Sequence, residues 1–537
     1  MPEFTSETSL TCPSKTAEDC RDCCPWLLSA WQGSCSMALF GIAVYVAAVV
    51  GATLYARRRK AEAAGGGLSL PAGLLSLDHS WAELVGSRHS TLNCLDAVRV
   101  LAMHWIFLNH LPSEGRIDVL KRDPQALVYK EHMRSSWLWT PIFGNSALGV
   151  DVFLLLGGFL VARSWMFKSR QLKEQGVSVT TVATFLGRAT QNLVRRWLRL
   201  MPSFAVFIWL TTTCLVQTII PRFIRPMFGG CGQFGIMSHL TFLNNLRAAP
   251  TCLGWLWYLS LDMQLYVLTL PLLFLFDRHA RLAAWSTVAL VLGSTILRGA
   301  GCAAFDTCNQ ADVSIPFIYF DGVSSQELQS IYSGVWQLYS SPLSKAGPYL
   351  IGFLMAYILN VAPADGKSGE ERSEEVEESK PDTPLYQREY VLYPASGLSV
   401  LAILLAIFGI LPIYSGAVPS AGWYSVVYFA TFRNALALGV AWLLFLHLKG
   451  VWNSVLNAAA WAPLARATYW VFLLHMPCVF LFTNVEAFQA ADVSFLFLLA
   501  CTAALSVIVY GLAFVAFLFV ESPLGRVGAE LMKRALQ

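Results

Sequence analysis

Charge is scarce in this sequence. Of its 537 residues, only 13% are Asp, Glu, Lys or Arg, whereas 55% are hydrophobic. A chain with so little charge is typical of membrane proteins rather than of soluble domains. The formal net charge is only +4, and no basic stretch is interleaved with aromatic residues, so we expect no nucleic-acid partner.

Motifs for cofactors and metals are also missing. The sequence contains no phosphate-binding loop, no zinc-ligand spacing and no internal repeat of solenoid or propeller length. We therefore expect no metal site and no tightly bound cofactor. The first 35 residues lack the basic-then-apolar layout of a cleavable signal peptide.

Long apolar runs are present instead. The first covers residues 36–56, and the basic cluster 57–60 follows it at once. Since basic residues favour the cytosolic side of a membrane, the N-terminus is expected outside or in a lumen. Ten further runs approach the roughly 20 residues that cross a bilayer. These runs are 93–111, 141–166, 197–220, 254–276, 282–299, 345–361, 392–412, 425–447, 467–487 and 494–520. The sequence predicts an all-α, polytopic transmembrane helix bundle with about 11 spans.

These spans divide the chain into segments. They are a Cys-rich extracytoplasmic tail (1–35), an N-terminal transmembrane anchor with its basic flank (36–60), a linker (61–91), a membrane domain (92–525) and a cytosolic tail (526–537). Within the membrane domain, the acidic, Pro-punctuated stretch 362–391 predicts a disordered cytosolic loop. The basic loop 167–196 falls inside, as the charge rule requires, whereas the basic loop 112–140 falls outside and is an exception.

Cysteine usage supports this orientation. Of 13 Cys, nine fall in segments predicted outside: Cys12, Cys20, Cys23, Cys24, Cys35, Cys231, Cys252, Cys302 and Cys308. An oxidising exterior or lumen produces this distribution, so we expect the disulfides Cys231–Cys252 and Cys302–Cys308. The alternative for Cys23 and Cys24 is palmitoylation of a cytosolic N-terminus. The predicted location is the plasma membrane or the endoplasmic reticulum, with membrane lipids as partners.

The run 92–111 is unusual because it carries ionisable residues. Arg99 and His110 are eleven positions apart, so on a helix they share one face and lie about 16 Å apart along the axis. His104 falls off that face. Ionisable groups inside a bilayer are functional candidates by default, but the alternative is that Arg99 and His110 each snorkel to an interface.

Other intramembrane polar residues fall into two predicted layers. The outer half holds His110, Asp151, Asp262 and Gln264, whereas the cytosolic half holds Arg99, Arg195, Arg196, Arg199, His475 and Glu521. Arginines on one side and a histidine deeper in the membrane suit a donor with a phosphate-bearing head. The alternatives are that the arginines are a positive-inside flank, and that Asp151 and Asp262 pair with Arg433 or with each other. Spacing alone leaves acyl transfer, transport and proton relay open.

Several stretches resemble one known family. The interval from Arg99 to His110 matches the R-x10-H signature of the acyltransferase 3 family. Further stretches resemble its animal, nose-resistant-to-fluoxetine-type branch, in family order. They are LNCLDAVRVLAMHWIFLNHL, GVDVFLLLGGFLVA, RRWLRLMPSF, LTFLNNL, CLGWLWYLSLDMQLYVL, SKAGPYLIGFLMAYIL, ARATYWVFLLHMP and VESP. The resemblance implies a ten-helix core, to which 36–56 adds one span, and transfer of an acyl group from cytosolic acyl-CoA to an acceptor on the other face.

The sequence departs from this family pattern at three places. Gly157 stands where the family usually has Ser before Gly-Phe-Leu, so a hydroxyl is absent. Lys345 stands where an Arg often precedes the Pro-Tyr-Leu block, which removes bidentate geometry. The large N-terminal domain of the animal branch is reduced to a short Cys-rich tail.

The sequence therefore predicts a membrane O-acyltransferase. We expect His110 to act as general base on the hydroxyl of an unknown lipid, glycan or protein acceptor, and Asp151 or Asp262 to orient its imidazole. We expect Arg99 and the cluster Arg195, Arg196 and Arg199 to bind the phosphates of acyl-CoA. The residues expected to support the site are Trp255, Tyr258, Gln264, His475 and Glu521. The alternative is a transporter or lipid-handling protein that keeps the fold without acyl transfer.

Overall fold

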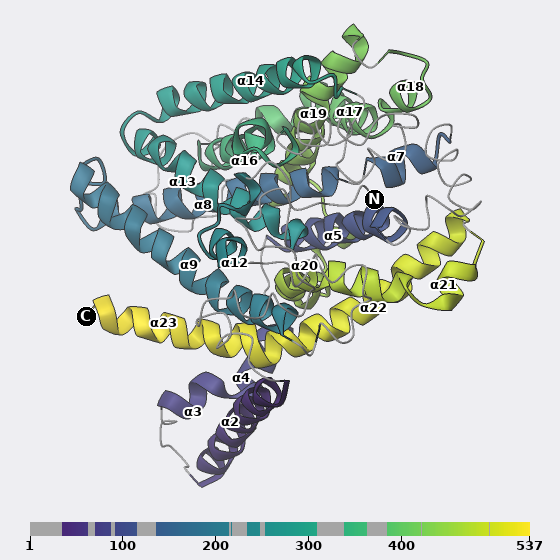
Figure 1. Cartoon of the computed structure of the whole chain (residues 1–537). Helices are drawn as coiled ribbons and strands as arrows, with labels where there is room; N and C mark the ends of the chain where they lie inside the picture. The colour runs from purple at the N-terminus through teal and green to yellow at the C-terminus, as the bar shows by residue number, and fades with distance from the viewer. Residues whose placement is uncertain are drawn as a thin grey trace, which may run out of the picture.

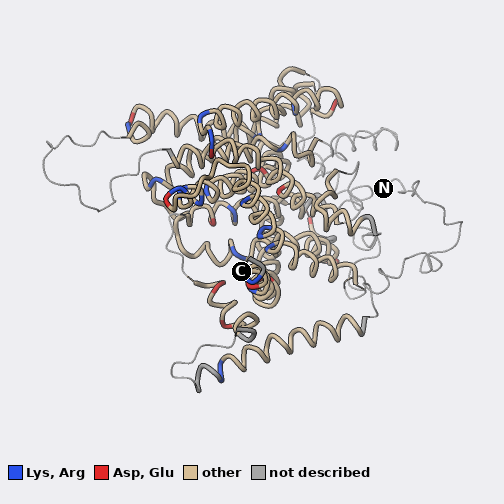
Figure 2. Tube along the Cα trace, turned by 90° about the vertical axis from the view of Figure 1, so that its left-hand side faces the viewer, with Lys and Arg blue, Asp and Glu red and all other residues tan. Residues whose placement is uncertain are grey.

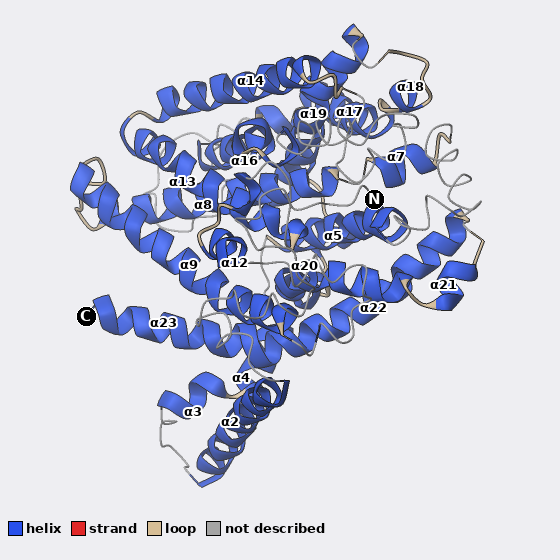
Figure 3. Cartoon of the chain, viewed as in Figure 1, coloured by secondary structure: helices blue, strands red, loops and turns tan. Residues whose placement is uncertain are grey.

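In the computed structural model the described residues form helices joined by loops and turns, and no strand occurs among them (Figure 3). The described residues are 35–62, 70–86, 92–114, 136–145, 147–213, 216, 233–246, 253–308, 338–361, 384–419, 422–492 and 494–536. The N-terminal tail, most of the acidic loop and the pair Cys231–Cys252 lie outside these ranges. The prediction of an all-α, polytopic bundle is confirmed.

Each of the predicted apolar runs coincides with a described helix (Figure 1). These helices are α2 (Cys35–Glu62), α5 (Asn93–Glu114), α8 (Leu148–Glu174), α9 (Val182–Thr212), α13 (Trp257–Arg278), α14 (Ala280–Ala304), α16 (Pro342–Val361), α17 (Glu389–Phe408), α19 (Trp423–Leu448), α20 (Trp461–Thr483) and α22 (Phe495–Ala516). By length and composition, eight stretches of the described chain can cross a membrane. The helices that fall short are α5, α9 and α16, because polar residues interrupt their apolar sequence.

Shorter elements connect these helices. They are α3 (Leu70–Leu75), α4 (Leu77–Val85), α7 (Trp139–Gly144), α12 (Gln233–Leu240), η4 (Asn244–Leu246), η5 (Gly254–Leu256), η7 (Leu385–Gln387), α18 (Leu411–Tyr414), η8 (Val455–Asn457), α21 (Glu486–Ala490), the π-helix η9 (Phe517–Glu521) and α23 (Ser522–Leu536). The predicted linker 61–91 thus contains two helices, and the predicted cytosolic tail lies within one.

Helices α8 and α16 pack backbone against backbone at the centre of the bundle. A Cβ on Gly158 would lie 1.9 Å from the carbonyl oxygen of Tyr349, and a Cβ on Gly352 would lie 2.1 Å from that of Leu155. Neither position can hold a larger residue without moving the other helix. Close approach through glycine is a common means of packing helices in membranes, where apolar side chains gain little by leaving lipid.

The segment formed by α2, α3 and α4 lies at one end of the molecule, against α23 (Figure 1). Arg526 of α23 donates hydrogen bonds to the carbonyl oxygens of Leu74 and Ser76 and to the Ser80 hydroxyl, at 2.8, 3.1 and 2.9 Å. The Tyr45 hydroxyl of α2 donates to the carbonyl oxygen of Phe519 at 2.6 Å. Figure 2 shows that α2 carries little charge along its length, as its membrane-anchor assignment requires.

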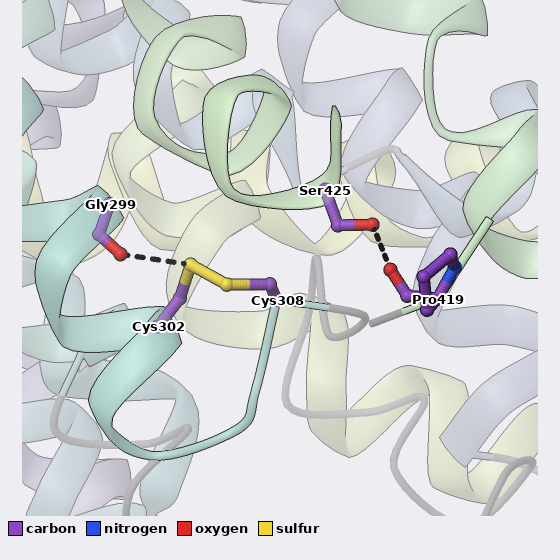
Figure 4. The surroundings of a disulfide bond; sticks show 5 residues. All are labelled: Gly299, Cys302, Cys308, Pro419 and Ser425. Atoms are coloured by element: carbon purple, nitrogen blue, oxygen red, sulfur yellow. Dashed lines mark hydrogen bonds between the residues drawn. A yellow bond between two sulfur atoms is a disulfide. The ribbon is translucent and has the colours of Figure 1, made fainter. Parts of the chain in front are cut away.

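The Cys302–Cys308 disulfide forms at the C-terminal end of α14 (Figure 4). Both half-cystines are buried, and the bond closes the turn that follows the helix. The Ser425 hydroxyl at the start of α19 donates to the carbonyl oxygen of Pro419 at 2.8 Å. The prediction of this disulfide is confirmed, whereas Cys231–Cys252 stays a prediction because it lies outside the described residues.

Candidate functional site

Helix α5 places Arg99 and His110 as the sequence predicts. It is continuous from Asn93 to Glu114, and both side chains are half-buried. His104 lies elsewhere: its ring stacks on Tyr510 of α22 at 5.5 Å between centroids, and its Nδ1 lies 2.8 Å from the carbonyl oxygen of Val100. Arg99 lies 3.7 Å from Asp96 in the first turn of the helix.

His110 faces a second histidine. The ring of His475, on α20, lies 5.3 Å from the His110 ring between centroids, with an angle of 49° between the planes. His475 is only 1% exposed, and Phe107 of α5 and Phe472 of α20 lie against its ring at 5.9 and 5.6 Å. The sequence identified His475 as a supporting residue but placed it in the opposite layer from His110.

A proline explains the local shape of α20 beside His475. Pro477 has no N–H, so it leaves the carbonyl oxygen four residues earlier, on Leu473, without its helical donor. The indole nitrogen of Trp255, in η5, lies 3.4 Å from that oxygen and donates to it. Trp255 therefore supports the site by holding η5 against the helix that carries His475.

Tyr258 connects this region to the charged groups of α9 and α13. Its ring packs edge-on against Phe472 at 5.6 Å, and the residue interacts electrostatically with Asp262, Arg196 and Arg99. Tyr258 thus lies between Phe472, which packs against His475, and the ion pair of Arg196 and Asp262.

Asp262, the other carboxylate expected to orient His110, forms an ion pair with Arg196. The Arg196 guanidinium also lies over the Tyr266 ring, 5.1 Å from its centroid. The sequence placed these two residues in opposite layers because it began the α9 span at residue 197. The helix begins at Val182, so Arg196 lies near its middle and reaches the α13 carboxylate.

Asp151 is likewise bound by cations. It is fully buried and pairs with Arg433 of α19 and with Lys345 of α16, whose Nζ lies 3.4 Å from the carboxylate. Lys345 also lies over the Tyr339 ring, 4.4 Å from its centroid. The alternative that Asp151 pairs with Arg433 is confirmed, and an orienting role toward His110 would require the carboxylate to leave these cations.

The predicted arginine cluster is not one cluster. Arg196 points into the bundle, whereas Arg195 and Arg199 are exposed. Successive positions on a helix project about 100° apart, so the adjacent Arg195 and Arg196 point in different directions. Arg199 interacts electrostatically with Glu521 of η9, which places that supporting residue against α9.

Gln264 has a structural role. Its amide nitrogen donates to the carbonyl oxygen of Phe242 and to the Asn245 side chain, both at 2.7 Å. Asn245 in turn donates to the carbonyl oxygen of Ser340 at 3.0 Å. Gln264 thus ties α13 to residues 242–245, which follow α12.

One buried ion pair was missed because its basic partner falls in a predicted loop. Arg188 of α9 donates to Asp277 of α13 at 2.8 Å and stacks on Trp165 of α8 at 3.9 Å. The Trp165 indole donates to the same carboxylate at 2.9 Å. A prediction of one helix that joins 182–196 to the next apolar run would have placed Arg188 on the bundle side.

Within the described ranges, no three His, Cys, Asp or Glu side chains are arranged to hold a metal ion.

Comparisons with known proteins agree with the resemblance found in the sequence. The family model of an acyltransferase domain, acyltransferase 3, matches residues 92–511. The chain is 36% identical over 465 residues to Regulator of hypoxia-inducible factor 1 of Caenorhabditis elegans, which covers 86% of this chain and 85% of that protein. It is 24% identical over 461 residues to Nose resistant to fluoxetine protein 6 of the same organism, covering 82% of this chain but about half (51%) of that protein. No solved structure matches the chain.

Proposed function

Because this chain belongs to the acyltransferase 3 family of multi-pass membrane proteins, we propose that it moves an acyl group from cytosolic acyl-CoA to a hydroxyl acceptor on the lumenal or extracellular side. One observation carries this proposal above the others. Within the matched region, α5 presents Arg99 and His110 at two depths, and the His110 ring faces the ring of the buried His475.

His110 acts as the general base in the proposed reaction. The imidazole takes the proton from the acceptor hydroxyl as its oxygen attacks the thioester carbonyl. The resulting intermediate expels the CoA thiolate, and His110 returns the proton to that sulfur. The products are an ester and free CoA, and no redox partner is required.

The donor binds through exposed and half-buried arginines. Arg195 and Arg199 are exposed on α9, and Arg99 is half-buried on α5. A guanidinium binds phosphate through two parallel hydrogen bonds and stays charged. Arg196 is assigned to Asp262 rather than to the donor. The CoA head lies on the cytosolic side, and its pantetheine arm reaches toward His110.

The acceptor is a hydroxyl group on a lipid, a glycan or a protein.

The orientation proposed for the site requires an external N-terminus and a cytosolic 362–391 loop. Accessibility of single tags placed in these two segments, in intact and permeabilised cells, tests it. A protected N-terminus with an accessible loop in intact cells would reverse the assignment.

The reaction is tested with purified protein in nanodiscs and labelled acyl-CoA. Wild-type protein should consume the thioester, and His110→Ala should lower turnover by about 10²–10⁴-fold with acyl-CoA affinity nearly unchanged, since a general base acts in the transition state. The matched control is His104→Ala, which removes an imidazole from the same helix at a position stacked on Tyr510 and should keep turnover.

Full turnover by a folded His110→Ala variant would overturn the catalytic assignment. Absence of any thioester consumption by the wild-type protein, together with saturable binding of acyl-CoA or a lipid, would favour the transporter or lipid-handling alternative.

A further inference from the structure

A catalytic imidazole needs a partner that holds its ring in place, and both carboxylates expected in that role are engaged by cations. Asp151 is held by Arg433 and Lys345, and Asp262 by Arg196. Moving either carboxylate to His110 would leave a buried cation without its counter-ion. The free energy lost in this way is several times larger than the free energy that a new hydrogen bond would contribute. The His475 ring lies against His110, at 5.3 Å between centroids.

The protonation of His475 follows from its backbone contact. Its Nδ1 lies 2.5 Å from the carbonyl oxygen of Phe472. A carbonyl oxygen only accepts hydrogen bonds, so Nδ1 carries the hydrogen. In a neutral imidazole with this tautomer, Nε2 has a lone pair and accepts.

The surroundings of His475 favour that neutral form. The side chain is 1% exposed and lies between the rings of Phe107 and Phe472. Charging an imidazole in such an apolar environment is costly. His475 is also held in place from outside α20, since Trp255 binds the carbonyl oxygen of Leu473 that Pro477 leaves available.

We propose that His475 is a positioning residue for His110, a role that rests on the proposed acyl transfer. Its Nε2 accepts a hydrogen bond from one ring nitrogen of His110 and so directs the other ring nitrogen toward the acceptor hydroxyl. When His110 takes the acceptor proton, the hydrogen bond to His475 strengthens because the donor is then cationic. The proton returns to the CoA sulfur through His110, and His475 remains neutral throughout.

Two substitutions separate this role from a packing role. His475→Phe keeps a planar ring among the neighbouring phenylalanines but removes the acceptor. His475→Gln places an amide oxygen near the position of Nε2 and so retains one. We expect His475→Phe to lower kcat by about 10–100-fold with KM for acyl-CoA changed less than twofold, because a misplaced base loses transition-state stabilisation only. His475→Gln should recover kcat to within about fivefold of wild type.

Folding is controlled by gel filtration and by acyl-CoA binding. If His475→Phe does not purify, His475→Leu is compared with His475→Gln in its place. The double variant His110→Ala/His475→Phe should be no slower than His110→Ala alone, since the second histidine acts through the first.

Three results would overturn the proposal, and they are distinguishable. Wild-type protein without acyl transfer would remove the proposed function and this role with it. Active wild-type protein, an impaired His110→Ala variant and a His475→Phe variant with normal kcat would leave the function standing and remove the role of His475. Equal loss in the Phe and Gln variants would also show that the acceptor atom has no part.

Discussion

Two of the polar regions of this bundle are built differently. In the charged region, Asp151 and Asp262 are each bound by a basic side chain from another helix. In the histidine region, His110 and His475 face each other across α5 and α20 among aromatic rings. Buried opposite charges hold helices together but are expensive to disturb. Imidazoles gain or lose a proton at little cost near neutral pH, so the second region is the one suited to chemistry.

The comparison predicts that changes in the charged region reduce folding, whereas changes in the histidine region reduce turnover. A mutation in the charged region that lowers only turnover, or one in the histidine region that lowers only stability, would contradict this comparison.

The largest expected effect is that of Asp151→Asn. The substitution leaves Lys345 and Arg433, which are 1% and 5% exposed, without the carboxylate between them. We expect a loss of about 3–5 kcal/mol of stability, measured by thermal unfolding of detergent-solubilised protein.

The control for Asp151→Asn is Asp78→Asn. Asp78 pairs with Arg57 on the exposed surface of α4, and exposed pairs contribute little. We expect no measurable change in unfolding temperature. A stable Asp151→Asn variant with impaired turnover would place Asp151 in the chemistry instead.

Arg196 gives the next largest effect. Arg196→Leu removes the cation from a carboxylate that is mostly buried, and we expect a loss of about 2–3 kcal/mol. The double variant Arg196→Leu/Asp262→Leu removes both charges and should regain much of that stability. Thermal unfolding of the single and double variants measures this. Retained stability of Arg196→Leu with a raised KM for acyl-CoA would instead support phosphate binding by Arg196.

The Cys302–Cys308 disulfide belongs to neither region and should affect stability alone. The bond joins residues six positions apart, so the chain-entropy model gives about 2 kcal/mol. Cys302→Ser/Cys308→Ser should therefore unfold at a lower temperature and keep the wild-type kcat. A kcat lowered at a temperature where the variant is folded would contradict this expectation.

The smallest effect is expected for Gly157→Ser, which restores the residue usual in the family. A Cβ at Gly157 would lie 3.3 Å from Asp262 Oδ1 and 3.5 Å from the Tyr349 ring, so the hydroxyl joins the charged region after a small adjustment. We expect a stability change below about 1 kcal/mol. Gly158→Ser is the contrast, because its Cβ would overlap the Tyr349 carbonyl oxygen and should prevent folding. A Gly157→Ser variant as unstable as Gly158→Ser would show that Asp262 and Tyr349 cannot move enough to accommodate the new side chain.

The sequence predicts the helices well and the contacts between them poorly. Apolar length identifies each span because the bilayer requires about 20 residues. The same criterion begins the α9 span at residue 197 and leaves its amphipathic first half in a loop, although the helix begins at Val182. The sequence therefore predicts that Arg188 and Arg196 belong to a cytosolic flank, whereas in the structure they pair with carboxylates on α13.

The histidine pair shows a second limit. The spacing of Arg99 and His110 is local, so one helix is enough to predict it. The approach of His475 depends on how α20 crosses α5, which joins residues more than 360 positions apart in sequence. No periodicity within either helix contains that information.

The hydrogen bonds between α23 and the segment 70–86 also set an order for membrane assembly. Arg526 supplies three of them, Ser522 donates to Glu83 at 2.6 Å, and Arg466 of α20 donates to the carbonyl oxygens of Leu84 and Gly86. Segment 70–86 is synthesised long before α20 and α23, so these hydrogen bonds form only after both helices have followed it. A chain truncated before α20 would therefore lack the arginine donors that bind the carbonyl oxygens of this segment, although every earlier helix is present.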